Sequence, residues 1–439
     1  MATASSLATA GLSSDQHRVY ADPPPSAQGL EKPDLTLGFV PVNDCAPFVV
    51  AVERGLFAKY GLRVRLSREA SWATARDGVI FGRLDAAPVV AGAVTNARLG
   101  AEGARRAPLC AAMTIHRHGN AITFNRAMWN HGLRPWAEYQ GQLDRFGQEL
   151  QQYFRGLPSH QRLWATVLSS STYEYCIRYL VAAAGLDPDA EFRLMIFPPP
   201  QMMTAMRMGA MQAYMVGEPW NTRSIAAGVG FTFAHGLEIW RGHPDRVLAV
   251  MESFIERYPR TYRALVMALI EACQYCSLHR EEVADLITTR AYTGVNRRFT
   301  RPALVGDYDY GGFDGQTRRR SLPDSTLFFD LPDDWDTPLH DHSTFLWQSQ
   351  ALWLVTQAVR WGQLPEIPVD IEQRLQRAWR TDLYREMATE LGIPCPREDL
   401  KIEPPAAFID GQAFDPGDPV GYVQQFPIRA QRPKTFAWS

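Results

Sequence analysis

The chain has 439 residues, of which 46% are hydrophobic and 21% charged, with a formal net charge of -2. This length exceeds that of one ordinary domain and the apolar content is ample for a core, so two lobes or one large domain with additions are expected. The near-neutral charge excludes a bulk basic field that would attract nucleic acid or an anionic membrane.

Residues 1–34 predict a flexible lead-in segment. They are rich in Ser, Ala and Pro and contain no basic start followed by an apolar run, so they do not match a secretory signal. No run of about twenty apolar residues occurs along the chain, so no membrane span is predicted. These features favour a cytoplasmic location.

The next segment, residues 35–118, predicts the first part of an α/β lobe. Strand-like and helix-like patterns alternate at 35–41, 46–61, 63–69, 71–84 and 85–92. Strand–helix alternation of this kind is typical of a parallel sheet with right-handed crossovers. A further strand over 111–125 is interrupted by Gly119, where we expect the chain to pass to a second lobe.

A second α/β set over residues 119–235 repeats this order. Strands are expected at 163–169, 192–200 and 213–220, and helices at 172–185, 200–209 and 221–229. Two α/β lobes joined by crossing strands predict an α/β protein with a hinged cleft.

The remaining chain is expected to return to the first lobe and to end in a surface tail. Residues 236–400 would contribute the return strand and helices, and residues 401–439 a Pro-rich tail. An exposed loop is expected over 300–330, because that segment is charged and rich in turn residues. Helices are expected over 340–395, with a packed aromatic face made by Trp347, Trp353 and Trp361.

The cleft walls should be the turns that follow the strands, because ligands of open α/β sheets lie beyond the carboxyl ends of strands. Trp72 lies in such a turn and would present an apolar wall and one N–H donor, although it could equally belong to the core. Asn120 follows Gly119 and could donate to an oxyanion, or be an ordinary turn residue. Thr172 and Tyr173 open a helix after a Ser-rich run, a place that favours anions but also suits simple capping.

Two charged residues complete the candidate set. Glu218 follows a strand of the second lobe and, if buried, needs a cation or a donor. Arg246 lies near the expected return crossing, and its planar guanidinium matches an oxyanion in shape and charge. Judged from its chemistry alone, an arginine such as Arg246 lies on the protein surface more often than in a ligand site.

No catalytic set is found in the sequence, and no enzyme activity, cofactor or metal site is predicted. GxSxG, HExxH, P-loop and GxGxxG motifs are absent, and the histidines are dispersed. Cys273 and Cys276 form a CxxC inside a helical pattern without a second pair, so we expect them to be packing residues.

Three stretches resemble the nitrate-binding and bicarbonate-binding proteins of the NrtA and CmpA type, which serve cyanobacterial ABC transporters. They are residues 37–90, which include SREASW, residues 198–231, with PPPQM and GEPWN, and residues 345–367. The resemblance runs from about residue 35 to about 400. It implies a type II periplasmic-binding-protein-like fold.

Within this family the LSREASW and RTDLYREMATELGIP segments resemble the cytoplasmic nitrate sensor NasS most closely. The resemblance implies a sensor that binds nitrate or nitrite and then releases a NasT-type RNA-binding antiterminator, without touching nucleic acid itself. Residue by residue, Trp72, Thr172 and Glu218 match the family. At three matching positions the transport proteins have other residues: a glutamine at Asn120, a histidine at Tyr173 and an anion-facing lysine at Arg246. These differences leave the choice of anion open.

Three alternatives remain from the sequence. The first is the substrate-binding component of a nitrate- or bicarbonate-type ABC transporter whose true start lies upstream. The second is an enzyme on the same fold, similar to the pyrimidine synthases of thiamine biosynthesis. The third is a binder of an organic ligand such as a sulfonate or a pyrimidine.

Overall fold

The computed structural model describes residues 29–331 and 342–431. Residues 1–28 of the expected lead-in, residues 340 and 341 of the expected helical region, and residues 432–439 of the tail lie outside these ranges. In the described part, every helix is too short or too polar to cross a bilayer.

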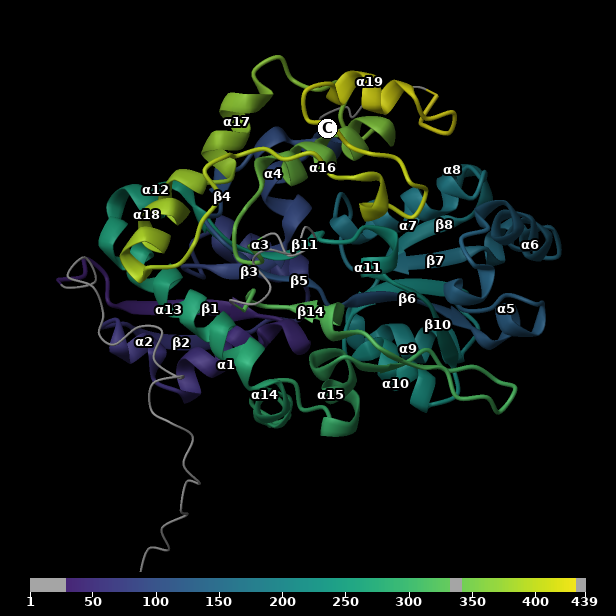
Figure 1. Ribbon diagram of the computed structural model, residues 1–439, viewed down its shortest axis with the longest axis horizontal. Coiled ribbons are helices and arrows are strands. Elements are labelled where there is room, and N and C mark those ends of the chain that lie inside the picture. Colours follow the sequence, from purple (N-terminus) through teal and green to yellow (C-terminus); the bar gives the residue numbers. More distant parts are fainter. Residues whose placement is uncertain (1–28, 332–341, 432–439) are drawn as a thin grey trace, which may run out of the picture.

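The fold is a two-lobed α/β arrangement with a separate sheet in each half (Figure 1). The first half holds a sheet with the strand order β14-β5-β11-β3, with β4 also paired to β11, and a parallel β1-β2 pair beside it. Its strands are β1 (Asp34–Phe39), β2 (Arg63–Arg68), β3 (Ala87–Val90), β4 (Leu109–Cys110), β5 (Thr114–His118), β11 (Pro244–Met251) and β14 (Thr326–Leu327).

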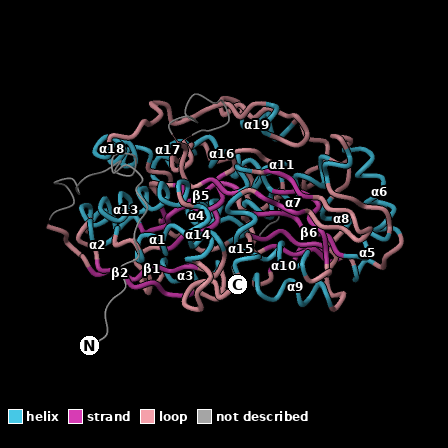
Figure 2. The backbone as a smooth tube through the Cα atoms, turned by 60° about the horizontal axis from the view of Figure 1, so that its bottom comes forward, coloured by secondary structure: helices cyan, strands magenta, loops and turns pink. Residues whose placement is uncertain are grey.

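The second half holds a five-stranded mixed sheet with the order β10-β6-β9-β7-β8. Here β7 pairs in parallel with β8 and β9, while β6 runs antiparallel to β9 and β10. Its strands are β6 (Asn120–Asn125), β7 (Leu163–Thr166), β8 (Arg193–Ile196), β9 (Ala213–Gly217) and β10 (Gly230–His235). Figure 2 shows the strands of both halves as a central band with helices on either side.

Helices cover both sheets, and β12 (Asp307–Asp309) and β13 (Arg319–Ser321) form a small antiparallel pair that follows α15. The first half carries α1 (Ala46–Glu53), α2 (Leu56–Lys59), α3 (Trp72–Ile80), α4 (Ala91–Leu99), α12 (Glu252–Arg257), α13 (Pro259–Leu278), α14 (Arg280–Leu286) and α15 (Arg297–Val305). The second half carries α5 (Arg126–Asn130), α6 (Leu143–Arg155), α7 (Thr172–Ala183), α8 (Pro188–Glu191), α9 (Pro199–Arg207), α10 (Trp220–Ala226) and α11 (Gly236–Ile239).

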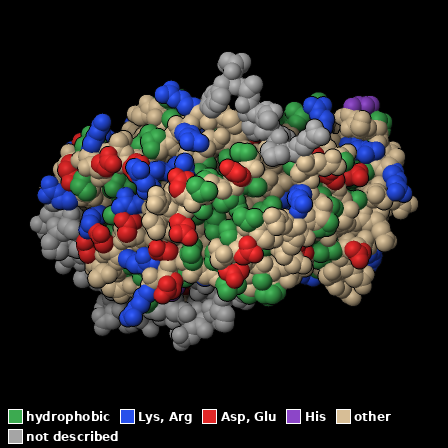
Figure 3. All heavy atoms as spheres, turned by 90° about the horizontal axis from the view of Figure 1, so that it is seen from above, with side chains coloured by type: hydrophobic (Ala, Val, Ile, Leu, Met, Phe, Trp, Pro, Cys, Tyr) green, Lys and Arg blue, Asp and Glu red, His purple; other side chains and the backbone are tan. Residues whose placement is uncertain are grey.

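The C-terminal helices and the described part of the tail lie along the top and the upper left of the molecule in Figure 1. They comprise α16 (Gln348–Arg360), α17 (Ile371–Ala378), α18 (Thr381–Leu391) and α19 (Pro419–Gln424). All three tryptophans of the predicted aromatic face are buried, but they do not form one face, because Trp353 and Trp361 belong to one hydrophobic cluster and Trp347 to another. Trp353 packs on Trp240 with a centroid separation of 4.1 Å. Basic and acidic side chains are interspersed on the face of the molecule that Figure 3 shows, in keeping with the small net charge.

The chain passes between the two sheets where the interrupted strand was expected to cross. β5 ends at His118 in the first sheet and β6 begins at Asn120 in the second, with Gly119 between them at a φ of 78°. A Cβ at Gly119 would lie 3.2 Å from the His116 ring, so glycine suits both the left-handed backbone and the close approach. The second connection runs from β10, which ends at His235, through α11 to β11.

The exposed loop expected over 300–330 is confirmed only for residues 311–324, which are exposed or half-buried, and is wrong for the largely buried flanks of the segment. It includes the end of α15, and Tyr308 and Tyr310 are buried in a small core with Ala303. Charged and turn-forming residues do surround these tyrosines, but the two aromatic rings provide enough apolar surface to anchor the segment.

Candidate functional site

Three elements bring candidate residues to the junction between the two sheets. α3 begins at Trp72 after Ser71, which forms a capping box with Thr74. α7 begins at Thr172 after Ser171, whose side chain accepts a hydrogen bond from Glu174 N. Both helices therefore begin immediately after a capping serine, which fixes the positions of the residues that follow. The third element, β11, carries the arginine.

Arg246 lies on β11 and is fully buried between two aromatic rings. Its guanidinium carbon lies 4.0 Å from the centroid of the Trp72 ring and 5.1 Å from that of Tyr173. Its Nη2 donates to the Tyr173 hydroxyl at 2.9 Å. The structure thus brings Trp72, Tyr173 and Arg246 together from three separate elements, two from the first half and one from the second.

The same guanidinium is paired with two buried carboxylates that the sequence reasoning missed. Its Nε lies 2.7 Å from Asp44 Oδ2, and its Nη1 pairs with Asp245 Oδ1. The Tyr173 hydroxyl also donates to Asp245 Oδ2 at 3.0 Å. Two sequence signals could have found them: Asp44 follows the first strand, as Trp72 follows the second, and Asp245 is adjacent to Arg246.

The electrostatics of this cluster follow from burial and pairing. Burial lowers the pKa of Arg246, but Asp245, Tyr173 and Asp44 outweigh it, so the pKa of the guanidinium is raised above its ordinary value. Burial raises the pKa of the Tyr173 hydroxyl well above its usual range. Arg246 is therefore a cation and Tyr173 a neutral phenol, and one positive charge faces two carboxylates.

His116 on β5 faces these carboxylates without reaching them. Its Nε2 lies 3.7 Å from Asp44 Oδ2 and 3.8 Å from Asp245 Oδ2, and the ring packs on Phe328. In the described part of the chain neither ring nitrogen has a hydrogen-bond partner, although the side chain is 1% exposed. A buried polar group is normally paired, so this imidazole calls for a hydrogen-bond partner that the described residues do not supply in the present arrangement.

Asn120 makes its side-chain hydrogen bonds to residues at the crossing strands, and among the described residues none of them is to Arg246. Its Nδ2 donates to His118 O at 3.1 Å and lies 2.9 Å from His243 Nε2. Because His243 Nδ1 lies 2.6 Å from Trp240 O, the hydrogen bonds define a neutral imidazole with its proton on Nδ1. Burial lowers the pKa of His243 to about 4, in agreement with that state.

Glu218 is held by residues other than the arginine. Tyr308 Oη donates to its Oε1 at 2.5 Å, and the Thr222 hydroxyl and backbone N donate to its Oε2 at 3.0 and 3.2 Å. Burial raises the pKa of this carboxyl, although these hydrogen bonds act in the opposite direction. Thr172, by contrast, is fully buried with its Oγ1 unpartnered among the described residues.

Close backbone contacts join the two halves around this cluster. Asn43 N donates to Glu218 O at 2.7 Å. A Cβ at Gly217 would lie 3.2 Å from Tyr173 Oη and 3.5 Å from Arg246 Nη2, and one at Gly92 would lie 2.8 Å from Ser170 O. Small residues therefore let the lobes approach closely.

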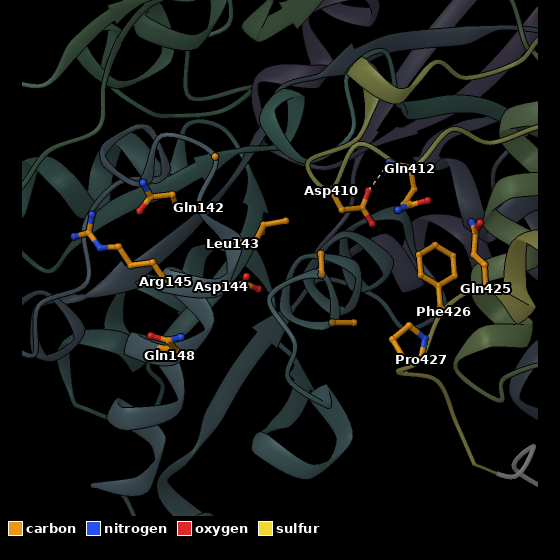
Figure 4. A pocket seen from close by; sticks show the side chains of 13 residues that line it. Gln142, Leu143, Asp144, Arg145, Gln148, Asp410, Gln412, Gln425, Phe426 and Pro427 are labelled. Atoms are coloured by element: carbon orange, nitrogen blue, oxygen red, sulfur yellow. Dashed lines mark hydrogen bonds between the residues drawn. The ribbon is translucent and has the colours of Figure 1, made fainter.

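A hollow elsewhere on the surface shares no residue with the predicted set. It has a volume of about 670 Å³ and lies between the start of α6, the end of α7 and the C-terminal tail (Figure 4). Its polar wall includes Asp410, which accepts from Gln412 N at 3.1 Å. The expected packing role of the CxxC agrees with its surroundings, since Cys273 and Cys276 are buried in α13 and burial raises the pKa of both thiols.

The fold is that of a class of two-lobed α/β binding proteins, and the comparisons below show the same class. The chain belongs to the NMT1-like family, whose model matches residues 28–290. It also matches the nitrate/nitrite binding protein NrtA of Synechococcus elongatus, with 29% identity over 429 residues, 93% of this chain and 90% of the relative. A crystal structure of the periplasmic nitrate-binding protein NrtA from Synechocystis superposes with a TM-score of 0.80 and 26% identity, covering 91% of this chain and 100% of that one.

A further relative is longer than this chain. The nitrate import ATP-binding protein NrtC of Synechocystis is 34% identical over 403 residues, which is 91% of this chain but 56% of that protein. The chain thus spans about half the length of the first curated relatives that it matches. The NrtA and CmpA resemblance found in the sequence is confirmed by these matches, which also include the bicarbonate-binding protein CmpA of Synechococcus elongatus at 28% identity over 92% of this chain and 88% of the relative.

Proposed function

We propose that the protein binds one small oxyanion, nitrate or a close analogue such as nitrite or bicarbonate, between its lobes and acts as a sensor rather than as an enzyme. The observation that carries this proposal is the fully buried guanidinium of Arg246 held between Trp72 and Tyr173. A planar guanidinium can donate two parallel hydrogen bonds to a planar anion, and in this site the anion would displace one of the two carboxylates that now pair with Arg246. The names of the NrtA and CmpA relatives support the same ligand class.

In this proposal Trp72, Thr172, Tyr173 and Arg246 contact the anion directly. The unpartnered Thr172 Oγ1 supports a donor role for that hydroxyl. Asn120 and Glu218 support the site without contacting the anion. Asn120 fixes the crossing strands, and Glu218 holds Tyr308 and the turn before α10. The boundaries of the lobes, at residues 118/119 and 235/236, are part of the same proposal, with the crossings serving as the hinge.

The two carboxylates on Arg246 require a proton to accompany the anion. The cluster of Arg246, Asp44 and Asp245 carries one excess negative charge before any ligand arrives, and a monovalent anion would add a second. Like charges in a buried site repel one another strongly. We infer that His116, unpartnered beside both carboxylates, takes up this proton as the anion binds.

The regulatory part of the proposal follows from thermodynamic linkage. A ligand shifts the equilibrium between open and closed lobes only by its difference in affinity for the two states. If a partner binds only the open state, anion and partner oppose one another by the same coupling free energy. The resemblance to NasS favours a NasT-type RNA-binding antiterminator as that partner, and a cytoplasmic site of action.

A second candidate function is supported by the match to NrtC. Since the chain is 34% identical to about half of an ATP-binding transport protein, it could serve as the ligand-responsive part of an ABC transporter. Co-purification separates the two. A sensor binds the antiterminator without anion and releases it with nitrate, whereas a transporter component retains a transporter protein under both conditions.

The ligand proposal is tested by thermal shift with nitrate, nitrite and bicarbonate, followed by titration calorimetry. We expect a rise in melting temperature and a single site for at least one of these anions, both lost in Arg246→Ala. Arg155→Ala is the matched control, because Arg155 is exposed and donates only to Gln151. Absence of a shift and of heat with all three anions would overturn the proposal and favour an organic ligand.

A further inference from the structure

A second hollow lies between the two lobes, and it is distinct from the Arg246 cluster. Its volume is about 690 Å³, and its walls come from α3, α4 and residues 101–108 of the first lobe and from residues 168–170 of the second. Trp72, Tyr173 and Arg246 are not among its lining residues. A concave site of this size at a junction of two lobes is typical of a small-molecule pocket.

One wall presents a buried acceptor without a donor. Asn96 on α4 is 5% exposed, and its Nδ2 donates to Ser170 O at 2.5 Å and to Tyr175 Oη at 3.0 Å. Its Oδ1 has no hydrogen-bond partner in the part of the chain that the structure describes. A buried polar atom is normally paired, so Asn96 Oδ1 calls for a donor from a molecule outside this chain.

The rim of the hollow has an excess of positive charge. Three arginines and two carboxylates line it, and Arg76 is already paired with Asp77 at 2.8 Å. Arg105 and Arg106 are exposed and form no ion pair within 4.0 Å among the described residues, although Arg106 lies near enough to Asp370 to help lower the pKa of that carboxyl. Arg106 Nε donates to Leu99 O. Both side chains line the hollow, where their guanidinium groups can meet an anionic group.

Two residues with a left-handed backbone also line the hollow. Glu102 has a φ of 56° and Ser170 a φ of 53°, and neither is a glycine. Non-glycine residues in this region are uncommon, and they cluster at ligand sites where the surrounding structure maintains them. The Glu102 carboxylate accepts from the Ser169 hydroxyl at 2.6 Å, which links the two lobes at this point.

We propose that this hollow binds an amphipathic organic anion, which is a different ligand from the small oxyanion proposed above. Its acidic group would pair with Arg105 and Arg106, a hydroxyl or N–H would donate to Asn96 Oδ1, and its apolar body would lie against Ile80 and Leu168. Because the walls belong to both lobes, such a ligand stabilises the arrangement in which the lobes are in contact.

Anilinonaphthalene sulfonate, which combines an aromatic body, an N–H and a sulfonate, is a suitable probe, and its fluorescence on the full chain gives the test. We expect one saturable site whose Kd rises about tenfold or more in the Arg105→Ala/Arg106→Ala double variant and in Ala97→Trp, which fills the hollow. Arg155→Ala should leave the Kd unchanged. Circular dichroism and melting temperature show whether each variant is folded.

Two results would overturn this proposal. One is many weak sites that respond equally little to all the variants, and the other is a single site unaffected by the Arg105, Arg106 and Ala97 changes. Probe fluorescence is measured without nitrate, so a negative result in this experiment is distinct from a negative result for the oxyanion site. Arg246→Ala should still bind the probe.

Discussion

Replacing His116 by glutamine tests whether anion binding is coupled to proton uptake. The ring of His116 lies within 3.8 Å of both carboxylates that pair with Arg246, so a proton on this ring offsets the negative charge that the anion adds. Glutamine keeps a polar side chain but cannot become cationic at neutral pH. In His116→Gln the anion therefore enters a cluster whose excess negative charge is not offset.

The size of the effect follows from Coulomb's law. Two unit charges about 5 Å apart interact by roughly 3 kcal/mol at an effective dielectric constant of about 20. We therefore expect His116→Gln to weaken nitrate binding by about two orders of magnitude, because the charge that the anion adds is no longer offset.

Titration calorimetry in buffers of different ionisation enthalpy measures this proton directly. At one pH, the observed heat varies with the buffer in proportion to the protons taken up. We expect about one proton per nitrate for the unaltered protein and for the exposed-residue control His160→Gln, and none for His116→Gln. Heats independent of the buffer in the unaltered protein, together with normal affinity in His116→Gln, would refute the charge argument.

Three further predictions concern the junction between the lobes. Burial lowers the pKa of His243 to about 4 in the folded state, below its unfolded value, so its contribution to stability is present above about pH 6.5 and is lost as the pH falls toward 4. We expect the free energy of unfolding to fall by about 2 kcal/mol by pH 5 for this reason. The urea midpoint should therefore depend less on pH in His243→Gln than in the control His160→Gln. Gly217→Ala places a methyl group 3.2 Å from Tyr173 Oη, so nitrate affinity should fall while the melting temperature changes little; unchanged affinity would show that the anion lies elsewhere. Tyr308→Phe leaves the buried Glu218 without one donor and should cost about 1–3 kcal/mol in urea unfolding, with a cost near zero contradicting the assignment.

Much of the fold and part of the site could be predicted from the sequence for identifiable reasons. Trp72 and Tyr173 lie in the first turns of helices that follow strands, and the alternation of strands and helices predicts which helix starts face the junction of the lobes. The glycine at 119 marked the crossing because only a residue that tolerates a left-handed backbone suits a break within a strand.

The charge balance of the site could not be predicted in the same way. Arg246, Asp44 and His116 are far apart in sequence, and their distances depend on the pairing of strands within the first half and on side-chain rotamers. The segment that contains Tyr308 was misjudged because its composition is that of a loop, whereas two buried aromatic rings anchor it in the structure. Composition reports the average environment of a segment and not the position of single large side chains.

A crystal structure of the protein grown with nitrate would test the central claim most directly. The account predicts one anion in hydrogen-bonding contact with the guanidinium of Arg246, against the indole of Trp72, with His116 drawn toward the carboxylates of Asp44 and Asp245. An Arg246 that keeps both carboxylates and has no anion beside it at saturating nitrate would contradict the account.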